Sequence, residues 1–154
     1  MEEKEIKQEC LKLMEKVNAI YLSTNGDDGY PHTRMMSNLR NKEENTGSAE
    51  VLAKEKNDDF SIYFVTSKSS TKMQQIRVNP KISAYLCNPR EFQTLMLTGE
   101  AEVVEDMKFK KQLWQDGWEI HWPGGADDPE FTVLKLLPGF ARGWYKEGPF
   151  EFKL

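Results

Sequence analysis

The segment of residues 66–80 gathers hydroxyl and lysine side chains directly behind a short apolar run. The apolar run, Phe60 to Val65, predicts a β-strand, and the residues that follow predict a short helix that ends at Asn79-Pro80. The first turn of a helix has unpaired backbone N–H groups and a partial positive charge. Hydroxyl groups and a lysine at that turn form a natural seat for a phosphate. The residues at that turn are Ser70, Thr71 and Lys72. The pattern therefore predicts a ligand that carries a phosphate.

The same residue types have a structural explanation as well. Serine and threonine are preferred at helix N-caps, and a lysine in the first turn of a helix is commonly hydrated. Taken alone, the hydroxyl cluster is better explained as a helix cap. The phosphate hypothesis therefore depends on combining this segment with others in the chain.

The composition limits the classes of protein to consider. The chain has 154 residues, enough for a single domain with a hydrophobic core, and 38% hydrophobic with 30% charged residues is typical of a soluble globular protein. A net charge of -4 argues against nonspecific nucleic-acid binding, which needs a basic face. The sequence predicts no transmembrane helix, and its first residues lack the apolar segment of a signal peptide. We therefore expect a cytoplasmic protein with no membrane partner.

The cysteines and histidines do not predict a metal site. Cys10 and Cys87 are the only cysteines, and two isolated cysteines support neither a disulfide framework nor a zinc site. With only His32 and His121, a histidine-rich metal centre is not expected either. A lone histidine on a strand, such as His32, is more often structural than catalytic, and we identify no general acid–base pair.

The first part of the chain predicts a helix followed by a β-hairpin. Apolar residues recur at helical spacing over residues 3–17, with Glu and Lys on the opposite face. Two strands, residues 19–24 and 30–39, flank strong turn signals at residues 25–29. Residues 40–59 are polar apart from a brief apolar interruption, and they predict an exposed excursion with room for a short helical turn.

The remaining strands predict a small antiparallel barrel. They are expected at residues 60–66, 81–87, 93–104, 131–137, 140–145 and 150–152. Gly99 predicts a bulge that bends the long strand, and Pro138-Gly139 predicts a turn between two strands. Strands joined mostly as hairpins, with short helices between them, predict a mostly β fold: a barrel with α-helices attached.

A further helix is expected after the long strand. Asp106 is placed to cap a helix that runs to about Gln115, with Met107 and Leu113 facing inward. Residues 118–129 are rich in Trp, Gly, Asp and Pro and predict a loop.

Three segments, in their order and spacing, resemble the FMN-binding split-barrel family that includes pyridoxamine 5'-phosphate oxidase. They are Pro31 to Asn38, Phe64 to Thr66 with Ser70 to Lys72 and Asn79-Pro80, and the strand Leu95 to Val103. The part from Trp122-Pro123-Gly124-Gly125 to Trp144-Tyr145 is similar to the general stress protein 26-like branch of that family. The resemblance covers residues 5–146 and implies an antiparallel, Greek-key-like split barrel that binds FMN noncovalently.

The resemblance implies that Arg34 and Lys72 hold the FMN phosphate. Both suit a dianionic phosphate, since arginine offers a planar fork of donors and lysine a point charge. Ser70 and Thr71 are implied to add hydroxyl and backbone donors. The oxidase has a second arginine at the position of Thr71, so we expect weaker neutralisation of the phosphate in this chain.

The resemblance also implies contacts along the flavin ring and from a partner subunit. In the family, FMN lies between the two subunits of a homodimer, and the long strand of the partner contributes a contact that Gln93 or Thr94 would supply here. Trp122 is expected to border the flavin. Two segments are implied to run along the isoalloxazine, with backbone groups that bond it: Met35, Met36 and Ser37, and Val65, Thr66 and Ser67.

One departure from the oxidase bears on the activity. The oxidase closes with an Arg-x-His segment that grips its substrate, whereas this chain reads Trp144-Tyr145-Lys146 there. Vitamin B6 oxidation is therefore not expected. We expect an FMN-dependent oxidoreductase that acts on a small molecule, with NAD(P)H as a plausible electron donor.

Three alternatives stay open. A flavin-binding stress or redox-sensing protein without turnover would carry the same cofactor residues. The deazaflavin F420 or haem could occupy the same barrel, although the scarcity of histidine disfavours haem. The groove could also have lost its cofactor and serve a partner protein, which the presence of Arg34 and Lys72 argues against.

Overall fold

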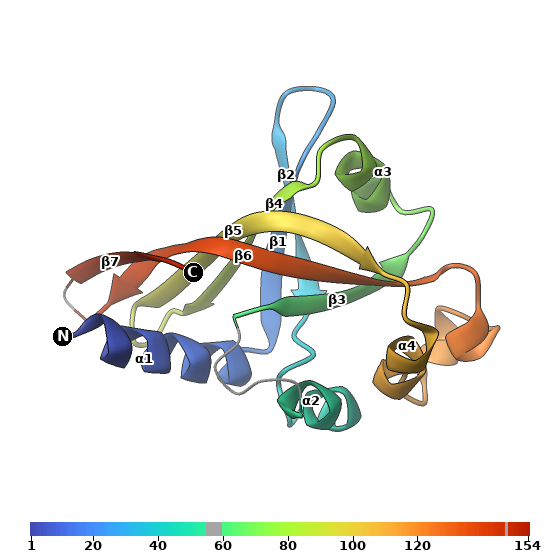
Figure 1. Ribbon diagram of the computed structural model, residues 1–154, viewed down its shortest axis with the longest axis horizontal. Coiled ribbons are helices and arrows are strands. Elements are labelled where there is room, and N and C mark those ends of the chain that lie inside the picture. Colours follow the sequence, from blue (N-terminus) through green and yellow to red (C-terminus); the bar gives the residue numbers. More distant parts are fainter. Residues whose placement is uncertain (55–59, 147) are drawn as a thin grey trace.

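The computed structural model describes residues 1–54, 60–146 and 148–154. Its main feature is a seven-stranded antiparallel sheet in the order β2-β1-β4-β5-β6-β3, with β7 also paired to β6 (Figure 1). The strands are β1 (Ala19–Asn25), β2 (Pro31–Ser37), β3 (Ile62–Ser67), β4 (Lys81–Asn88), β5 (Gln93–Val104), β6 (Phe131–Tyr145) and β7 (Gly148–Lys153). The sheet forms a half-barrel, so the mostly β, antiparallel split-barrel fold that the sequence predicts is confirmed.

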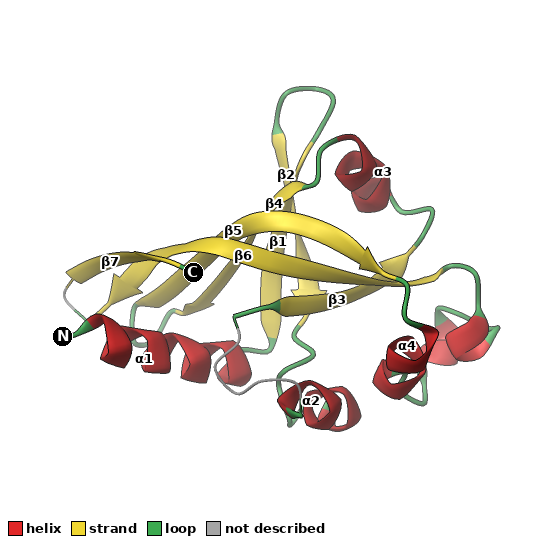
Figure 2. Cartoon of the chain, in the orientation of Figure 1, coloured by secondary structure: helices red, strands yellow, loops and turns green. Residues whose placement is uncertain are grey.

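Four α-helices surround the sheet in the described residues (Figure 2). They are α1 (Glu3–Lys16), α2 (Thr46–Ala53), α3 (Thr71–Val78) and α4 (Met107–Leu113). Helix α1 buries Cys10, Leu13 and Met14 in the main core, as the helical spacing of these residues predicts. None of the described helices is both long and apolar enough to cross a membrane.

The alternation of side chains along the strands divides the sheet into a buried and an open face. In β1, Leu22 is fully buried and Thr24 is 1% exposed, while Tyr21, which directly precedes Leu22, is 39% exposed. Strand register places Tyr21 beside Met35 of β2 and Tyr85 of β4, which are also exposed. The outer face of these three strands is therefore lined by large apolar and aromatic side chains.

Helix α3 lies beside the end of the β1–β2 hairpin. It connects β3 to β4, strands that are not neighbours in the sheet, and it contacts β1 (Figure 1). Met73 and Ile76 anchor the helix in the main core. The start of α3 is thereby brought close to β2, which forms one edge of the sheet.

Strand β6 corrects the prediction of a turn at Pro138-Gly139. It runs without a break from Phe131 to Tyr145, and the irregularity is a bulge between Thr98 and Gly99 of the neighbouring strand β5. Gly99 pairs with Pro138, and a Cβ atom on Gly99 would clash with the Leu137 carbonyl oxygen. The bulge predicted at Gly99 is confirmed, and it lets a proline remain within a continuous strand because the regular ladder is already interrupted there.

The prediction of an exposed excursion over residues 40–59 is confirmed only in part for its described residues: α2 supplies the short helical turn, but several polar side chains are not exposed. Asn41, Asn45 and Ser48 are buried, although they are polar. Asn41 Nδ2 donates to the carbonyl oxygens of Lys16 and Val17 at 3.0 and 3.2 Å, and so satisfies the end of α1. These side chains can be buried because they are hydrogen-bonded. Residues 55–59 of the excursion lie outside the described residues.

Helix α4 begins and ends close to the prediction. The Asp106 carboxylate accepts hydrogen bonds from the backbone N–H groups of Lys108 and Phe109, and Leu113 is fully buried. Met107 is 45% exposed, so its predicted inward position is wrong. The loop that follows contains two short 3-10 turns, Trp118–Ile120 and Gly125–Asp127.

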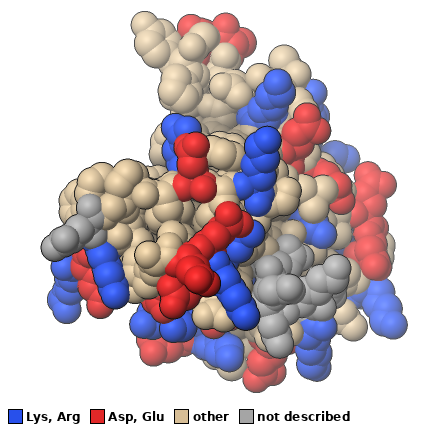
Figure 3. Space-filling view, turned by 60° about the vertical axis from the view of Figure 1, so that its left-hand side comes forward, with Lys and Arg blue, Asp and Glu red and all other residues tan. Residues whose placement is uncertain are grey.

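Basic and acidic side chains are interspersed on the face that Figure 3 shows. On α1, Lys7 forms an ion pair with Glu3 and Lys12 with Glu9. Among the described residues of this face, the cations do not gather into one continuous basic surface.

Candidate functional site

Arg34 lies at the edge of the sheet, on the side of β2 that faces the core. It pairs with Leu22 of β1 and is half-buried, while its neighbours along β2 are exposed. Its Nη1 atom donates to Thr24 Oγ1 at 2.8 Å and to the carbonyl oxygens of His32 and Leu22 at 3.0 and 3.2 Å. The guanidinium group is thereby held against the hairpin.

Lys72 lies in the first turn of α3, where the sequence predicts it. Its Nζ atom donates to Thr66 Oγ1, near the end of β3, at 2.8 Å. Ser70 is the N-cap, and its Oγ atom accepts the backbone N–H of Met73 at 3.4 Å. Thr71 is exposed at the first position of the helix. The predicted helix cap and the predicted cation therefore occur together at one helix start.

The two cations are close enough to influence each other electrostatically. Burial lowers the pKa of Lys72, and the positive charge of Arg34 lowers it further. Burial also lowers the pKa of Arg34. In the described part of the chain neither side chain forms an ion pair with a carboxylate. A half-buried pair of like charges is costly without a counter-charge, so this site favours an anion.

Two further residues, Thr24 and Gln75, complete the site and were not predicted from the sequence. Thr24 Oγ1 donates to Gln75 Oε1 at 2.5 Å, and the Arg34 Nη2 atom donates to the same oxygen at 3.3 Å. Gln75 stands three residues after Lys72, which places both on one face of α3. That spacing was a usable signal for Gln75, whereas no local pattern shows that α3 packs beside Thr24.

The predicted flavin-contacting residues of β2 lie on two faces. Met35 is 68% exposed on the outer face, together with Ser37, while Met36 is 9% exposed and belongs to the core. This division follows from strand alternation. Arg34 shares the side of Met36, so the side chain of Met35 points away from the guanidinium group.

The predicted residues of β3 are divided in the same way. Thr66 is buried on the side of Lys72, while Val65 and Ser67 are half-buried on the opposite side. Trp122 is 6% exposed and donates its indole N–H to Ser67 Oγ at 3.1 Å. Its ring also packs against Phe131. Trp122 is thus fixed beside the end of β3, and its contact with a flavin stays a prediction.

Gln93 and Thr94 lie apart from the anion site within one chain. They open β5, which is separated from β2 by β1 and β4. The Gln93 side chain donates to the Glu9 carbonyl oxygen at 3.4 Å, and Thr94 Oγ1 accepts the Trp144 backbone N–H at 2.9 Å. The structure of one chain therefore does not bring them to Arg34 and Lys72, and their predicted contact across a subunit interface stays a prediction.

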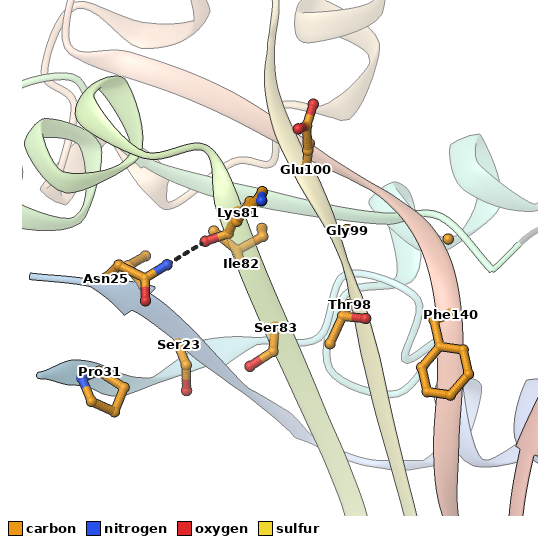
Figure 4. Close-up of a pocket in the computed structure, with 12 residues that line it drawn as sticks. Ser23, Asn25, Pro31, Lys81, Ile82, Ser83, Thr98, Gly99, Glu100 and Phe140 are labelled. Atoms are coloured by element: carbon orange, nitrogen blue, oxygen red, sulfur yellow. Dashed lines mark hydrogen bonds between the residues drawn. The ribbon is translucent and has the colours of Figure 1, made fainter. Parts of the chain in front are cut away.

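An open hollow lies on the outer face of the sheet (Figure 4). Its volume is about 460 Å³, and strands β1, β4, β5 and β6 line it. Hydroxyl side chains of neighbouring strands, Ser23, Ser83 and Thr98, form a row that ends beside Phe140 of β6. At its rim, the Asn25 amide donates to the Lys81 carbonyl oxygen at 3.0 Å. The hollow combines polar groups with an aromatic surface.

The fold and the site define a class of protein: a split barrel in which a sheet edge and a helix start carry two neighbouring, half-buried cations. Residues 32–153 match the profile of the family described as pyridoxamine 5'-phosphate oxidase like, and the chain belongs to this family. The resemblance inferred from the sequence is therefore confirmed.

The relatives include general stress proteins. The chain is 26% identical over 141 residues to general stress protein 26 of Bacillus subtilis (strain 168), covering 90% of this chain and 87% of the relative. A solved structure of a protein related to general stress protein 26, from Clostridium acetobutylicum, is 28% identical with a TM-score of 0.77, covering 99% of this chain and 97% of the other. A pyridoxamine 5'-phosphate oxidase-related, FMN-binding protein from Nostoc punctiforme shares the fold, at 16% identity and a TM-score of 0.68, covering 98% and 89%.

Proposed function

We propose that this protein is a flavoprotein that binds FMN noncovalently, with the FMN phosphate between Arg34 and Lys72. The observation that carries the proposal is the pair of half-buried cations, close enough that Arg34 contributes to lowering the pKa of Lys72, which have no carboxylate partner among the described residues. Membership of the family and the shared fold with an FMN-binding protein support the choice of cofactor.

The rest of the proposed site follows from the position of the phosphate. Ser70 and Thr71 stand at the helix start with Lys72, where backbone N–H groups are free to bond phosphate oxygens. The ends of β2 and β3 would run along the flavin ring, with Met35, Ser37 and Val65 nearest the surface. Trp122 would border the ring through its contact with Ser67.

We propose that the protein is an oxidoreductase with a small-molecule substrate and NAD(P)H as electron donor. Bound FMN supplies two-electron chemistry, while the chain binds and orients it. Within the described residues, the side chains of Arg34 and Lys72 donate hydrogen bonds only to neutral groups: hydroxyls, a carboxamide and backbone carbonyls. Because the sequence identifies no general acid–base pair, we propose a reaction in which the chain supplies none. Pyridoxamine 5'-phosphate oxidation is not proposed, because Trp144-Tyr145-Lys146 replaces the substrate-gripping segment.

We further propose that the protein is a homodimer whose interface includes the outer face of the sheet. Tyr21, Met35 and Tyr85 form one exposed row across three neighbouring strands. A second copy would remove this apolar row from water, which is the main driving force of association. The same copy would bring its Gln93 or Thr94 to the flavin.

A flavin-binding stress or redox-sensing protein without turnover is the second candidate. It is favoured by the similarity to general stress protein 26 and by the neutral surroundings of the two cations. Steady-state oxidation of NAD(P)H by the purified protein separates the two candidates. A bound flavin that no nicotinamide reduces would favour the second.

The first experiment is to purify the protein, record its absorbance spectrum and identify the chromophore released on denaturation by mass. We expect FMN, recognised by its absorbance in the blue and its fluorescence. F420 or haem in that fraction would overturn the choice of cofactor. A colourless protein that does not bind added FMN would refute the proposed function.

A further inference from the structure

Gln75 connects the two elements that carry the cations, although it carries no charge itself. Its Oε1 atom accepts hydrogen bonds from Thr24 of β1 and from Arg34 of β2. Arg34 Nη1 is already engaged by three acceptors of the hairpin, so Gln75 fixes the second terminal nitrogen of the guanidinium group. The planar group is therefore held at both ends, and its orientation is set from two elements.

The amide nitrogen of Gln75 is available for a ligand. A carboxamide has one acceptor oxygen and two N–H donors, and the oxygen is the atom turned toward Thr24 and Arg34. Within the described residues, the Gln75 Nε2 atom donates to no acceptor. No buried side-chain nitrogen or oxygen of these residues lacks a hydrogen-bond partner, so Nε2 is not buried. It is therefore a donor that is exposed to solvent and available to a ligand.

The neutrality of Gln75 matters for the anion site. A glutamate at this position could accept the same two hydrogen bonds, but its charge would pair with Arg34 and neutralise it. An arginine–glutamate ion pair of this kind occurs on the exposed surface, where the Arg142 Nη2 atom lies 3.4 Å from Glu151 Oε2. On α3, by contrast, the partner of Arg34 is the amide of Gln75, which is isosteric with glutamate but leaves the positive charge available.

We propose that Gln75 is a positioning residue for Arg34 and a third side-chain donor to the phosphate, an inference that rests on the proposed binding of FMN. It orients the guanidinium group with its oxygen, leaves the charge of Arg34 unneutralised, and donates its amide N–H to a phosphate oxygen. The phosphate is then bonded from β2 by Arg34 and from α3 by Lys72 and Gln75. A phosphate monoester is the ligand class that this combination of two cations and a neutral donor selects.

The test is Gln75→Glu, with binding of FMN and riboflavin measured for each variant. Riboflavin lacks the phosphate, so the ratio of the two affinities isolates the contribution of the phosphate. We expect FMN affinity to fall about 10- to 100-fold, as for the loss of one charge-assisted contact, and riboflavin affinity to stay unchanged. The melting temperature of the flavin-free variant should not fall, because the carboxylate accepts both hydrogen bonds.

Gln74→Glu is the matched control. Gln74 is exposed and adjacent on the same helix, so the variant gains the same charge without contacting Arg34. It should lose less than about threefold in FMN affinity, since exposed charges are screened by salt. A second variant, Gln75→Met, removes the acceptor without adding charge. It should lower both the melting temperature of the flavin-free protein and the preference for FMN over riboflavin.

The pKa of the bound FMN phosphate, measured by ³¹P NMR, distinguishes a contact with the phosphate from a purely structural role of Gln75. A purely structural role would leave this pKa unchanged. In Gln75→Glu the added negative charge should raise the pKa of the bound phosphate relative to the original protein. If the original protein prefers FMN to riboflavin and Gln75→Glu keeps that preference, the role of Gln75 is refuted while FMN binding stands. If the original protein binds neither flavin, the proposed function fails as well.

Discussion

Replacing both proposed phosphate ligands, Arg34→Ala with Lys72→Ala, should abolish retention of FMN while leaving the fold intact. Neither side chain belongs to the hydrophobic core, and both are half-buried at the surface of the helix start and the sheet edge. Removing them also removes the repulsion between two cations. The flavin-free variant should therefore be folded, with a circular dichroism spectrum like that of the original protein.

The magnitude follows from the contacts that each cation would make. A hydrogen bond to a charged group contributes about 1.5–3 kcal/mol, so two such contacts contribute roughly 3–6 kcal/mol. This corresponds to a loss of about 10²- to 10⁴-fold in affinity. Because both cations would bind the same phosphate, the losses of binding free energy in the two single variants should not sum to the loss in the double variant. Affinity for riboflavin should change by less than about threefold.

The assay is titration of flavin fluorescence or calorimetry on the flavin-free proteins, with Arg77→Ala as the control. Arg77 is an exposed cation in the last turn of the same helix, and its Nη2 atom donates to the Lys68 carbonyl oxygen at 2.7 Å. Its removal therefore changes the charge of α3 without removing a hydrogen bond of Arg34 or Lys72. Unchanged FMN affinity in the double variant would refute the assignment of Arg34 and Lys72. An equal loss for FMN and riboflavin would show that the damage is not at a phosphate site.

Three further predictions concern stability and reactivity. Burial lowers the pKa of Lys72, so the folded state binds this proton less tightly than the unfolded state. The contribution of Lys72 to the stability of the flavin-free protein should therefore rise as pH rises from the lowered pKa toward 10.5, and Lys72→Met should remove that contribution. Because a half-exposed charge is screened by solvent, the unfolding free energy of Lys72→Met at pH 7 should rise by less than about 1 kcal/mol in denaturant titrations. Gly99→Ala should cost about 2–3 kcal/mol in the same titrations, because its Cβ meets a strand carbonyl, whereas Gly139→Ala, which points into open space, should change stability by less than about 0.5 kcal/mol. Burial raises the pKa of Cys10 to about 12, so in a Cys87→Ser background a thiol reagent should react only after unfolding, and rapid labelling of the native protein at pH 7.5 would contradict its buried position.

Local signals predicted the elements that carry the site. Ser70 caps α3 and Asp106 caps α4, because short polar side chains accept the free N–H groups of a first helical turn. Gly99 was identifiable as a bulge because a glycine inside a strand lets another backbone approach closely. Each of these features depends on residues that are near one another in the sequence.

The errors arose where distant contacts override local preference. Pro138-Gly139 has the composition of a turn, but the bulge on β5 accommodates it within a continuous strand. Asn41 and Asn45 have the composition of an exposed loop, but they are buried where they bond carbonyl groups of α1 and of the residue that follows β2. A polar side chain becomes a buried one only when another element supplies its partner.

The sequence by itself determined the strand alternation, the helix start with its serine cap and lysine, and the presence of an arginine on the second strand of a hairpin. These follow from periodicity and capping, which act over a few residues. Only the tertiary structure decided that α3 packs beside the hairpin, so that Thr24 and Gln75 join Arg34 and Lys72. The burial of Met73 and Ile76 fixes that position, and burial against distant strands is a property of the folded core rather than of any short segment.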